Sequence, residues 1–225
     1  MVKLKCHLLP QITEIHAQSS ELDRHPNPLL MAGLEDDFDT LHANPDHLIF
    51  KNSRIYQHQV LQIHYTTYDV RHAEDILNPN TEHCDIMMLH HSESSKQGPN
   101  WFGYTRIIGI YHANIQYIRS GMKDYLAWRM DFLHVRWFER VPQQDLHGLD
   151  ALRFIRMEDC SSFDFVDLSD VLRGCHLLPV FRYGKLHQEQ IAMSHIAWDL
   201  DDWTFYYVNR YYDRLRHNFA ILLCR

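Results

Sequence analysis

Histidine and cysteine are the first residue types that could do chemistry here, because both bind zinc. Adjacent pairs of these residues occur at Cys6-His7, His83-Cys84, His90-His91 and Cys175-His176. Consecutive residues on a strand point to opposite faces, so such a pair does not offer two ligands to one ion as C-x-x-C does. We therefore expect no metal site and no other cofactor, and we interpret these side chains as ordinary residues of a histidine-rich chain.

Acidic clusters could serve the metal-dependent chemistry of nucleases. The two sets are Asp36, Asp37 and Asp39, and Asp199, Asp201 and Asp202. Nuclease sites draw carboxylates from separate elements of a rigid scaffold, whereas each set falls within one loop-like stretch. We interpret both sets as solvated loops.

Other catalytic signals are weak. The chain has no phosphate-binding loop, dinucleotide fingerprint, G-x-S-x-G or H-E-x-x-H motif. Ser169 or Cys175 could act as a nucleophile only beside a base, and the 18 histidines supply a nominal base almost anywhere. We expect no catalytic residue and no enzyme activity.

The stretch RMDFLHVRWFER, residues 129–140, combines charge with large apolar groups. Its alternation predicts a strand that buries Leu133, Val135 and Trp137 and exposes His134 and Arg136. Arginine makes bidentate contacts with phosphate, so this strand and the next supply candidate DNA contacts. The candidates are Arg129, Arg136, Arg140, Arg153 and Arg156. The alternative interpretation is that these arginines pair with the many carboxylates of the chain.

Aromatic residues are abundant, and each ring could belong to the core or to a cage for a methylated lysine. We take Tyr104 as an exposed ring that contacts a partner.

The elements that must position these residues are mostly strands. We expect a helix over 3–18 that Pro10 interrupts, then an acidic connector over 19–47. Strands follow over 55–70, 86–90 and 101–118, and the glycines of the last predict a bulge or a close approach. After the strand at 129–140, Ser169 begins a one-turn helix that ends at Gly174. A strand over 175–181 and an aromatic strand near 203 complete the pattern.

Composition sets the broad class. The 225 residues are 45% hydrophobic, which suffices for one core, and the net charge of −7 gives no general attraction to nucleic acid. Five scattered cysteines without C-x-x-C indicate reduced thiols, and no signal-peptide or membrane-spanning pattern occurs. We expect a soluble intracellular protein with no membrane partner and no small-molecule substrate.

Five blocks in order resemble the C-terminal region of Plavaka-type transposases of mushroom-forming fungi. The blocks are the run from NSRIYQHQVLQIHYTTYDV to CDIMML, then WFGYTRIIGIYHANI, RMDFLHVRWFER, DFVDLSDVLRGCHLLPVF and WTFYYVNRYYDR. The resemblance implies a piece of a transposase-derived protein, because the catalytic DDE core of that family lies upstream of the matching region. No catalytic aspartate carries over.

A looser similarity links the chain to bromo-adjacent homology domains, which are bent β-barrels of chromatin proteins. It is carried by Trp101, by Arg106-Ile107, by the V-x-WF-x-R pattern at residues 135–140 and by VLRGCHLLPV. The resemblances imply a mostly β chain with a bent small β-barrel, an N-terminal helical or irregular arm and a short C-terminal helix. The expected boundaries are an arm over 1–49, the barrel over 50–215 and a tail over 216–225.

The expected function is that of a non-catalytic accessory module that contacts chromatin proteins or targets the protein, in the nucleus if functional. A DNA-binding module that uses the local arginine patch and a non-functional relic of a mobile element are the alternatives.

Overall fold

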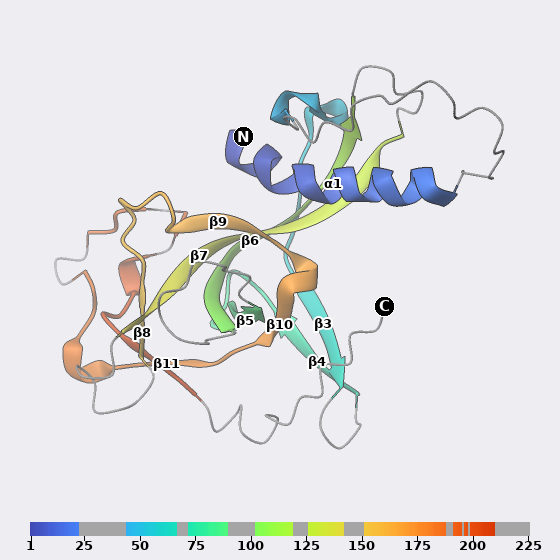
Figure 1. The fold of residues 1–225 in the computed structure, drawn as a ribbon. Helices are drawn as coiled ribbons and strands as arrows, with labels where there is room; N and C mark the ends of the chain where they lie inside the picture. The colour runs from blue at the N-terminus through green and yellow to red at the C-terminus, as the bar shows by residue number, and fades with distance from the viewer. Residues whose placement is uncertain are drawn as a thin grey trace, which may run out of the picture. The chain divides into compact units, whose positions relative to one another are not determined.

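The computed structural model describes residues 1–22, 44–66, 72–89, 102–118, 126–141, 151–187, 191–194, 196–197 and 199–209. The described part is mostly β, with one α-helix at its N-terminal end (Figure 1). It forms two compact units. Unit 1 comprises Met1–Tyr56 and His112–Met130, and unit 2 comprises Gln57–Tyr111 and Asp131–Arg225. The first unit therefore extends beyond the arm expected over 1–49.

Helix α1 (Val2–Leu22) supplies much of the core of unit 1. Leu4, Leu8 and Ile12 recur every four residues and are at most 3% exposed, so one face of the helix is buried. Strand β1 (Leu48–Phe50) pairs with β6 (Phe102–Tyr117) in the same unit.

The predicted interruption at Pro10 is wrong, because α1 is continuous through this residue. Pro10 lies on the exposed side of the helix. Proline inside a helix removes one hydrogen bond and costs about 3 kcal/mol, which the burial of the apolar face offsets here.

Unit 2 is built on one curled, half-barrel sheet (Figure 1). Its strands follow the order β10-β5-β6-β7-β8-β12-β11, and β9 also pairs with β7. Their bounds are β5 (Asp85–Leu89), β7 (Trp128–Val141), β8 (Ala151–Phe154), β9 (Phe163–Asp167), β10 (Val171–Gly174), β11 (Leu177–Pro179) and β12 (Tyr206–Val208). The strands β6 and β7 are the longest of the described strands and contribute residues to both units.

The predicted mostly β fold with an N-terminal helical arm is confirmed. The strands expected over 86–90, 101–118 and 129–140 are present as β5, β6 and β7. The expected short C-terminal helix falls after residue 209, outside the described residues.

Two local predictions are wrong. The single strand expected over 55–70 is divided into β2 (Tyr56–His58), which pairs with β6, and β3 (Leu61–Thr66), which pairs with β4 (His72–Leu77). The helix expected from Ser169 to Gly174 is a 3-10 turn at Leu168–Asp170 followed by β10. Asp167 caps that turn by accepting a hydrogen bond from the Ser169 N–H, and pairing with β5 then keeps the chain extended.

The two-stranded β3-β4 sheet is joined to β10 through Asp75. The carboxylate of Asp75 accepts hydrogen bonds from the Gly174 N–H at 3.0 Å and the Tyr65 hydroxyl at 3.1 Å. Leu77 lies so close to Gly174 that an added Cβ would be 3.0 Å from its Cδ2. Glycine at position 174 therefore permits this close packing.

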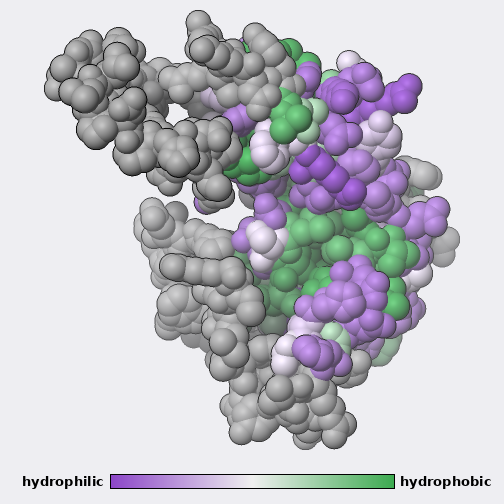
Figure 2. Space-filling view, turned by 90° about the vertical axis from the view of Figure 1, so that its right-hand side faces the viewer, coloured by the Kyte–Doolittle hydropathy of each residue, from purple (hydrophilic) through white to green (hydrophobic). Residues whose placement is uncertain are grey.

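Large apolar side chains are not confined to the core. Figure 2 shows hydrophobic residues gathered in the middle of one face, with hydrophilic residues around them. In unit 2, Val60 and Ile76 are 49% and 57% exposed.

Substitution Pro10→Ala tests the continuity of α1. We expect it to increase helicity and to raise the free energy of unfolding by up to about 3 kcal/mol, because it restores a backbone donor inside the helix. Far-UV circular dichroism and urea denaturation measure both effects. Leu8→Ala is the matched control in the same turn and should lower stability by about 2 to 5 kcal/mol. A loss of stability in Pro10→Ala would show that the helix is interrupted.

Candidate functional site

A buried network of arginine and aspartate lies at the centre of unit 2. The register of β5 and β6 places Asp85 opposite Arg106. The Arg106 guanidinium donates from Nε to Asp85 Oδ1 at 2.8 Å and from Nη2 to Oδ2 at 3.2 Å. It also donates from Nη1 to Asp202 Oδ1 at 3.0 Å. This bidentate geometry is the strong form of an arginine–carboxylate pair.

Asp202 joins Arg106 to a second arginine. Arg136 Nη1 on β7 donates to Asp202 Oδ2 at 2.5 Å. The side chains of Arg136 and Asp202 are 2% and 1% exposed, so the pair is removed from water. One carboxylate therefore holds two guanidinium groups that come from neighbouring strands.

Aromatic rings surround the two guanidinium groups. The Cζ atoms of Arg136 and Arg106 lie 3.8 Å and 4.8 Å from the centre of the Phe154 ring. Phe138 stacks on Phe154 with ring centres 4.0 Å apart, and Tyr206 meets both rings edge-on. The negative ring faces attract the cations, and the rings exclude water from the ion pairs.

Burial and charge shift the pKa values in this network. Burial raises the pKa of Asp202, and the charges of Arg136 and Arg106 oppose that shift. Burial lowers the pKa of Arg106, but the Asp85 carboxylate outweighs this effect and holds it well above its usual range. Burial, together with the charge of Asp85, raises the pKa of the Cys84 thiol to about 12. Cys84 is therefore protonated at neutral pH and is a poor nucleophile.

A pocket opens beside this network, with a cavity volume of about 440 Å³. Arg136 and Phe154 belong both to the network and to the pocket wall. The wall also includes a run that follows β8, a pair of residues after β11 and the segment that leads into β12. These residues are Arg153, Ile155, Arg156, Met157, Glu158, Leu186, His187, Met193, Trp203, Thr204 and Phe205. The pocket is thus lined by cationic and aromatic groups and has one acidic residue.

The arginines of the pocket differ in their partners. Arg153 Nε donates to Glu139 Oε1 at 2.6 Å, and the two side chains are 49% and 41% exposed. Arg156 is exposed and makes no ion pair with any residue in the described part of the chain. Arg156 is therefore available to an anion from outside.

Asp199 organises the other side of the pocket. Its carboxylate is fully buried and accepts hydrogen bonds from the N–H groups of Met193 at 2.8 Å and Ser194 at 3.1 Å. The Nε2 atom of His187 lies 3.1 Å from Asp199 Oδ2. Burial raises the pKa of Asp199, but these backbone donors and His187 outweigh it and hold the pKa below its usual range. The segment that carries Met193 is thus tied to a buried charge.

The structure corrects several predicted side-chain positions. Arg136, expected to be exposed, is 1% exposed because Asp202 neutralises it. Asp199 and Asp202, expected in a solvated loop, are 0% and 1% exposed because they bind backbone donors and arginines. Tyr104, expected to be an exposed contact, is 9% exposed and belongs to the core of unit 2.

The five candidate arginines have different surroundings. Arg136, Arg153 and Arg156 line one pocket, and the alternative that arginines pair with carboxylates is confirmed for Arg136 and Arg153. Arg140 lies over the Tyr104 ring, with its Cζ 5.7 Å from the ring centre. Arg129 is exposed in unit 1. Because Arg136 is buried, the five arginines do not all face solvent.

Asp85 and Arg106 were missed as partners in the sequence. Pairing the two expected strands as neighbours in an antiparallel sheet would have indicated this ion pair, because the register of β5 and β6 places Asp85 opposite Arg106. The second acidic cluster carried a weaker signal: Asp202 is followed directly by the aromatic run WTFYY. Asp36, Asp37 and Asp39 lie outside the described residues.

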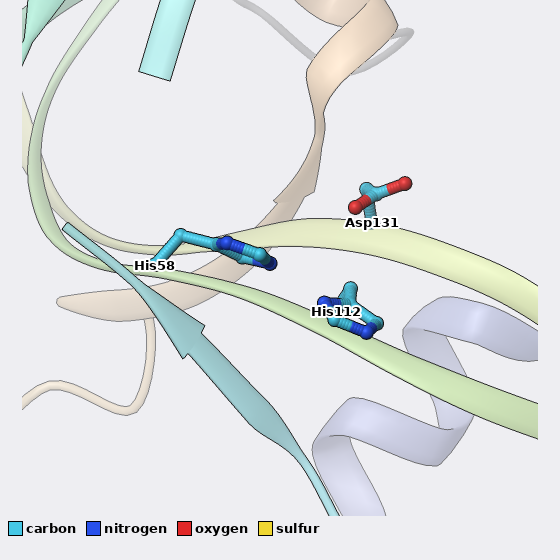
Figure 3. A group of neighbouring side chains, drawn as sticks. All are labelled: His58, His112 and Asp131. Atoms are coloured by element: carbon cyan, nitrogen blue, oxygen red, sulfur yellow. The ribbon is translucent and has the colours of Figure 1, made fainter. Parts of the chain in front are cut away.

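Two histidines and one aspartate are of the residue types that bind metals. Figure 3 shows these side chains, which are His58 of β2, His112 of β6 and Asp131 of β7. His112 belongs to unit 1, whereas His58 and Asp131 belong to unit 2. These side chains therefore define no metal centre within either unit.

The fold and the pocket define a class: a mostly β module with a curled sheet, a buried arginine–aspartate network and, beside it, a pocket lined by arginine and apolar side chains. Comparisons with protein-family models, curated proteins and solved structures found no match for this chain. Within the described part, no helix combines the length and the apolar character needed to cross a membrane.

Replacing Arg136 tests the central ion pair. We expect Arg136→Met to lower the free energy of unfolding by about 3 to 5 kcal/mol, because Asp202 would keep a buried charge without this partner. Arg153→Met is the matched control, because its pair with Glu139 is about half exposed and should contribute less than about 1 kcal/mol. Urea denaturation measures both values. Equal losses for the two variants would contradict the central role of the buried pair.

The ionisation of Asp199 should make the free energy of unfolding depend on pH. Its pKa in the folded state is lowered, so its contribution is present above the unfolded value, near 3.8, and is lost as pH falls through the folded value. We expect the difference in unfolding free energy between the wild type and Asp199→Asn to be constant near neutral pH. The difference should shrink below the unfolded value. Urea denaturation at a series of pH values measures it, and a difference that grows on acidification would contradict the assignment.

Proposed function

We propose that this chain is a non-catalytic binding module, an accessory C-terminal part of a transposase-derived protein that contacts a protein or chromatin partner. One observation carries the proposal. The buried carboxylates of the network are committed to arginines and backbone donors, while an open pocket lined by arginine and aromatic side chains lies beside them.

The committed carboxylates support a role without catalysis. Metal-dependent phosphoryl transfer needs carboxylates that can ligate divalent cations. Here the two carboxylate oxygens of Asp85 accept from Arg106, and those of Asp202 accept from Arg106 and Arg136. A metal ion would have to displace a guanidinium group from a buried, water-excluded pair. The partly buried thiol of Cys175, whose pKa is raised well above its usual value by desolvation, is likewise unsuited to nucleophilic attack.

Two surface features support binding. The pocket volume of about 440 Å³ lies within the range of about 300 to 1,000 Å³ that is typical of ligand sites. A hydrophobic area inside a hydrophilic border, as in Figure 2, is typical of protein interaction surfaces.

The resemblance to Plavaka-type transposases supports the proposal that the chain derives from a transposase. Its matching blocks fall on the strands that form the scaffold, among them β6 and β7, rather than on the pocket alone. The similarity to bromo-adjacent homology domains agrees with a curled β sheet and motivates a chromatin partner and a nuclear location.

DNA binding is the second candidate, because Arg136, Arg153 and Arg156 line the same pocket. Two of these arginines already pair with carboxylates, which weakens this candidate. A non-functional relic is the third candidate. Against it, both carboxylates of the buried network, Asp85 and Asp202, are matched by arginines, although random substitution would readily break such a pair.

The proposal is tested by binding and nuclease assays on the purified full chain. We expect binding to reconstituted nucleosomes, with little loss of affinity between low and moderate salt, and no cleavage of DNA with magnesium or manganese. Steeply salt-dependent binding to naked DNA would favour the DNA-binding module instead. DNA cleavage would overturn the non-catalytic role.

Phe205→Ala and Gln62→Ala test whether the pocket is the binding site. Phe205 lines the pocket, so its truncation should weaken binding about tenfold, the cost of losing one aromatic contact. Gln62, which pairs with Glu74 on the exposed β3-β4 sheet, does not line the pocket and serves as the control. Equal affinities for the two variants would place the binding site elsewhere.

A further inference from the structure

We propose that the pocket of unit 2 binds an acidic peptide segment, in which a carboxylate pairs with Arg156 and a neighbouring apolar side chain packs on the methionines of the wall. This inference rests on the proposed binding function and names the chemical class of its partner.

Charge is the first argument for an anionic ligand. The wall contains three arginines and one carboxylate, Glu158. The partners of Arg136 and Arg153, which are Asp202 and Glu139, are not part of the wall. The carboxylates that pair with these two arginines therefore lie outside the pocket wall.

Arg156 and Arg153 are the groups that a carboxylate can reach. Arg156 is exposed and has no ion pair within the described part of the chain. The exposed pair of Arg153 with Glu139 contributes little, so an incoming carboxylate can share or replace Glu139. Arg136 is neutralised by Asp202, so the charge that a ligand meets comes from Arg156 and Arg153.

The net charge of the chain distinguishes a peptide from nucleic acid. The whole chain carries −7, so the exposed guanidinium of Arg156, unpaired among the described residues, is a local cation on an acidic chain. An extended polyanion would meet the repulsive field of the rest of the surface, whereas a short acidic segment interacts mainly with the pocket. The charge pattern therefore favours the peptide.

Apolar side chains on the pocket wall are the argument for an apolar side chain in the ligand. Met193 is 63% exposed and Leu186 is 45% exposed, and Met157 lies on the same wall. Methionine adapts its shape to apolar partners, and Trp203 and Phe205 add large apolar surface. A peptide with an acidic residue next to a leucine or phenylalanine would pair with the arginines and pack on the apolar side chains of the wall.

The pocket is also prepared before binding. Asp199 holds the Met193 N–H, and Asp202 holds Arg136. Groups held in place beforehand lose less conformational freedom when a ligand binds.

Fluorescence polarisation on the full chain tests the inference. The probe is a labelled peptide of alternating aspartate and leucine. The comparison probes are the same peptide with lysine for aspartate, the same peptide with alanine for leucine, and a labelled single-stranded DNA. We expect the aspartate-leucine peptide to bind, with each altered peptide at least about tenfold weaker.

Charge variants identify the binding group. Arg156→Glu should weaken binding about tenfold or more, and Arg156→Lys should retain part of it, because lysine keeps the charge without the bidentate geometry. Arg182→Glu is the matched control, since Arg182 is an exposed arginine of unit 2 that does not line the pocket. Circular dichroism confirms that each variant is folded.

The outcomes separate this inference from the proposed function. Unchanged binding in Arg156→Glu, or tighter binding of the DNA than of the peptide, overturns the acidic-peptide assignment. If the acidic peptide fails while nucleosomes or histone peptides bind, only the ligand class is wrong. If none of these partners binds, the proposed function fails as well.

Discussion

Burial of the Arg136–Asp202 ion pair is the constraint on which unit 2 depends. Two charges that are almost completely removed from water are stable only when they pair at short distance, and further partners for their polar atoms lower the cost of burial. The Nε atom of Arg136 has no hydrogen-bond partner among the described residues. Asp202 has a further partner in Arg106, which in turn binds Asp85. The positions of β5, β6, β7 and the segment before β12 are thereby linked through one polar network.

The network also determines where a ligand could bind. Phe154 packs on the Arg136 guanidinium with one part of its surface and lines the pocket with another. Asp199, three residues before Asp202, ties Met193 of the pocket wall to the same short acidic segment. The segment from Asp199 to Asp202 is therefore structural in two ways: Asp202 links strands of the sheet, and Asp199 shapes the pocket. Because the carboxylates of the network are already bound to arginines and backbone donors, we propose a binding role for this pocket rather than metal-dependent catalysis.

Part of this arrangement could be predicted from the sequence. The β-branched and aromatic runs of β6 and β7 predicted long strands, and these strands are the centre of the sheet. Alternation failed at Arg136, because it assumes that one face of a strand meets water, whereas in a curled sheet both faces of β7 are covered. Propensity failed at Pro10, because the buried face of α1 outweighs one lost hydrogen bond.

The sequence by itself determined the class of the fold, since runs of β-branched and aromatic residues are a local signal. Only the tertiary structure decided which charges are buried, because pairing depends on residues far apart in the chain: Arg106 with Asp202, and Arg136 with the same carboxylate. An aspartate beside other acidic residues looks solvated when only its neighbours are considered. It becomes a core residue here because the sheet brings two guanidinium groups to it and excludes water from the site.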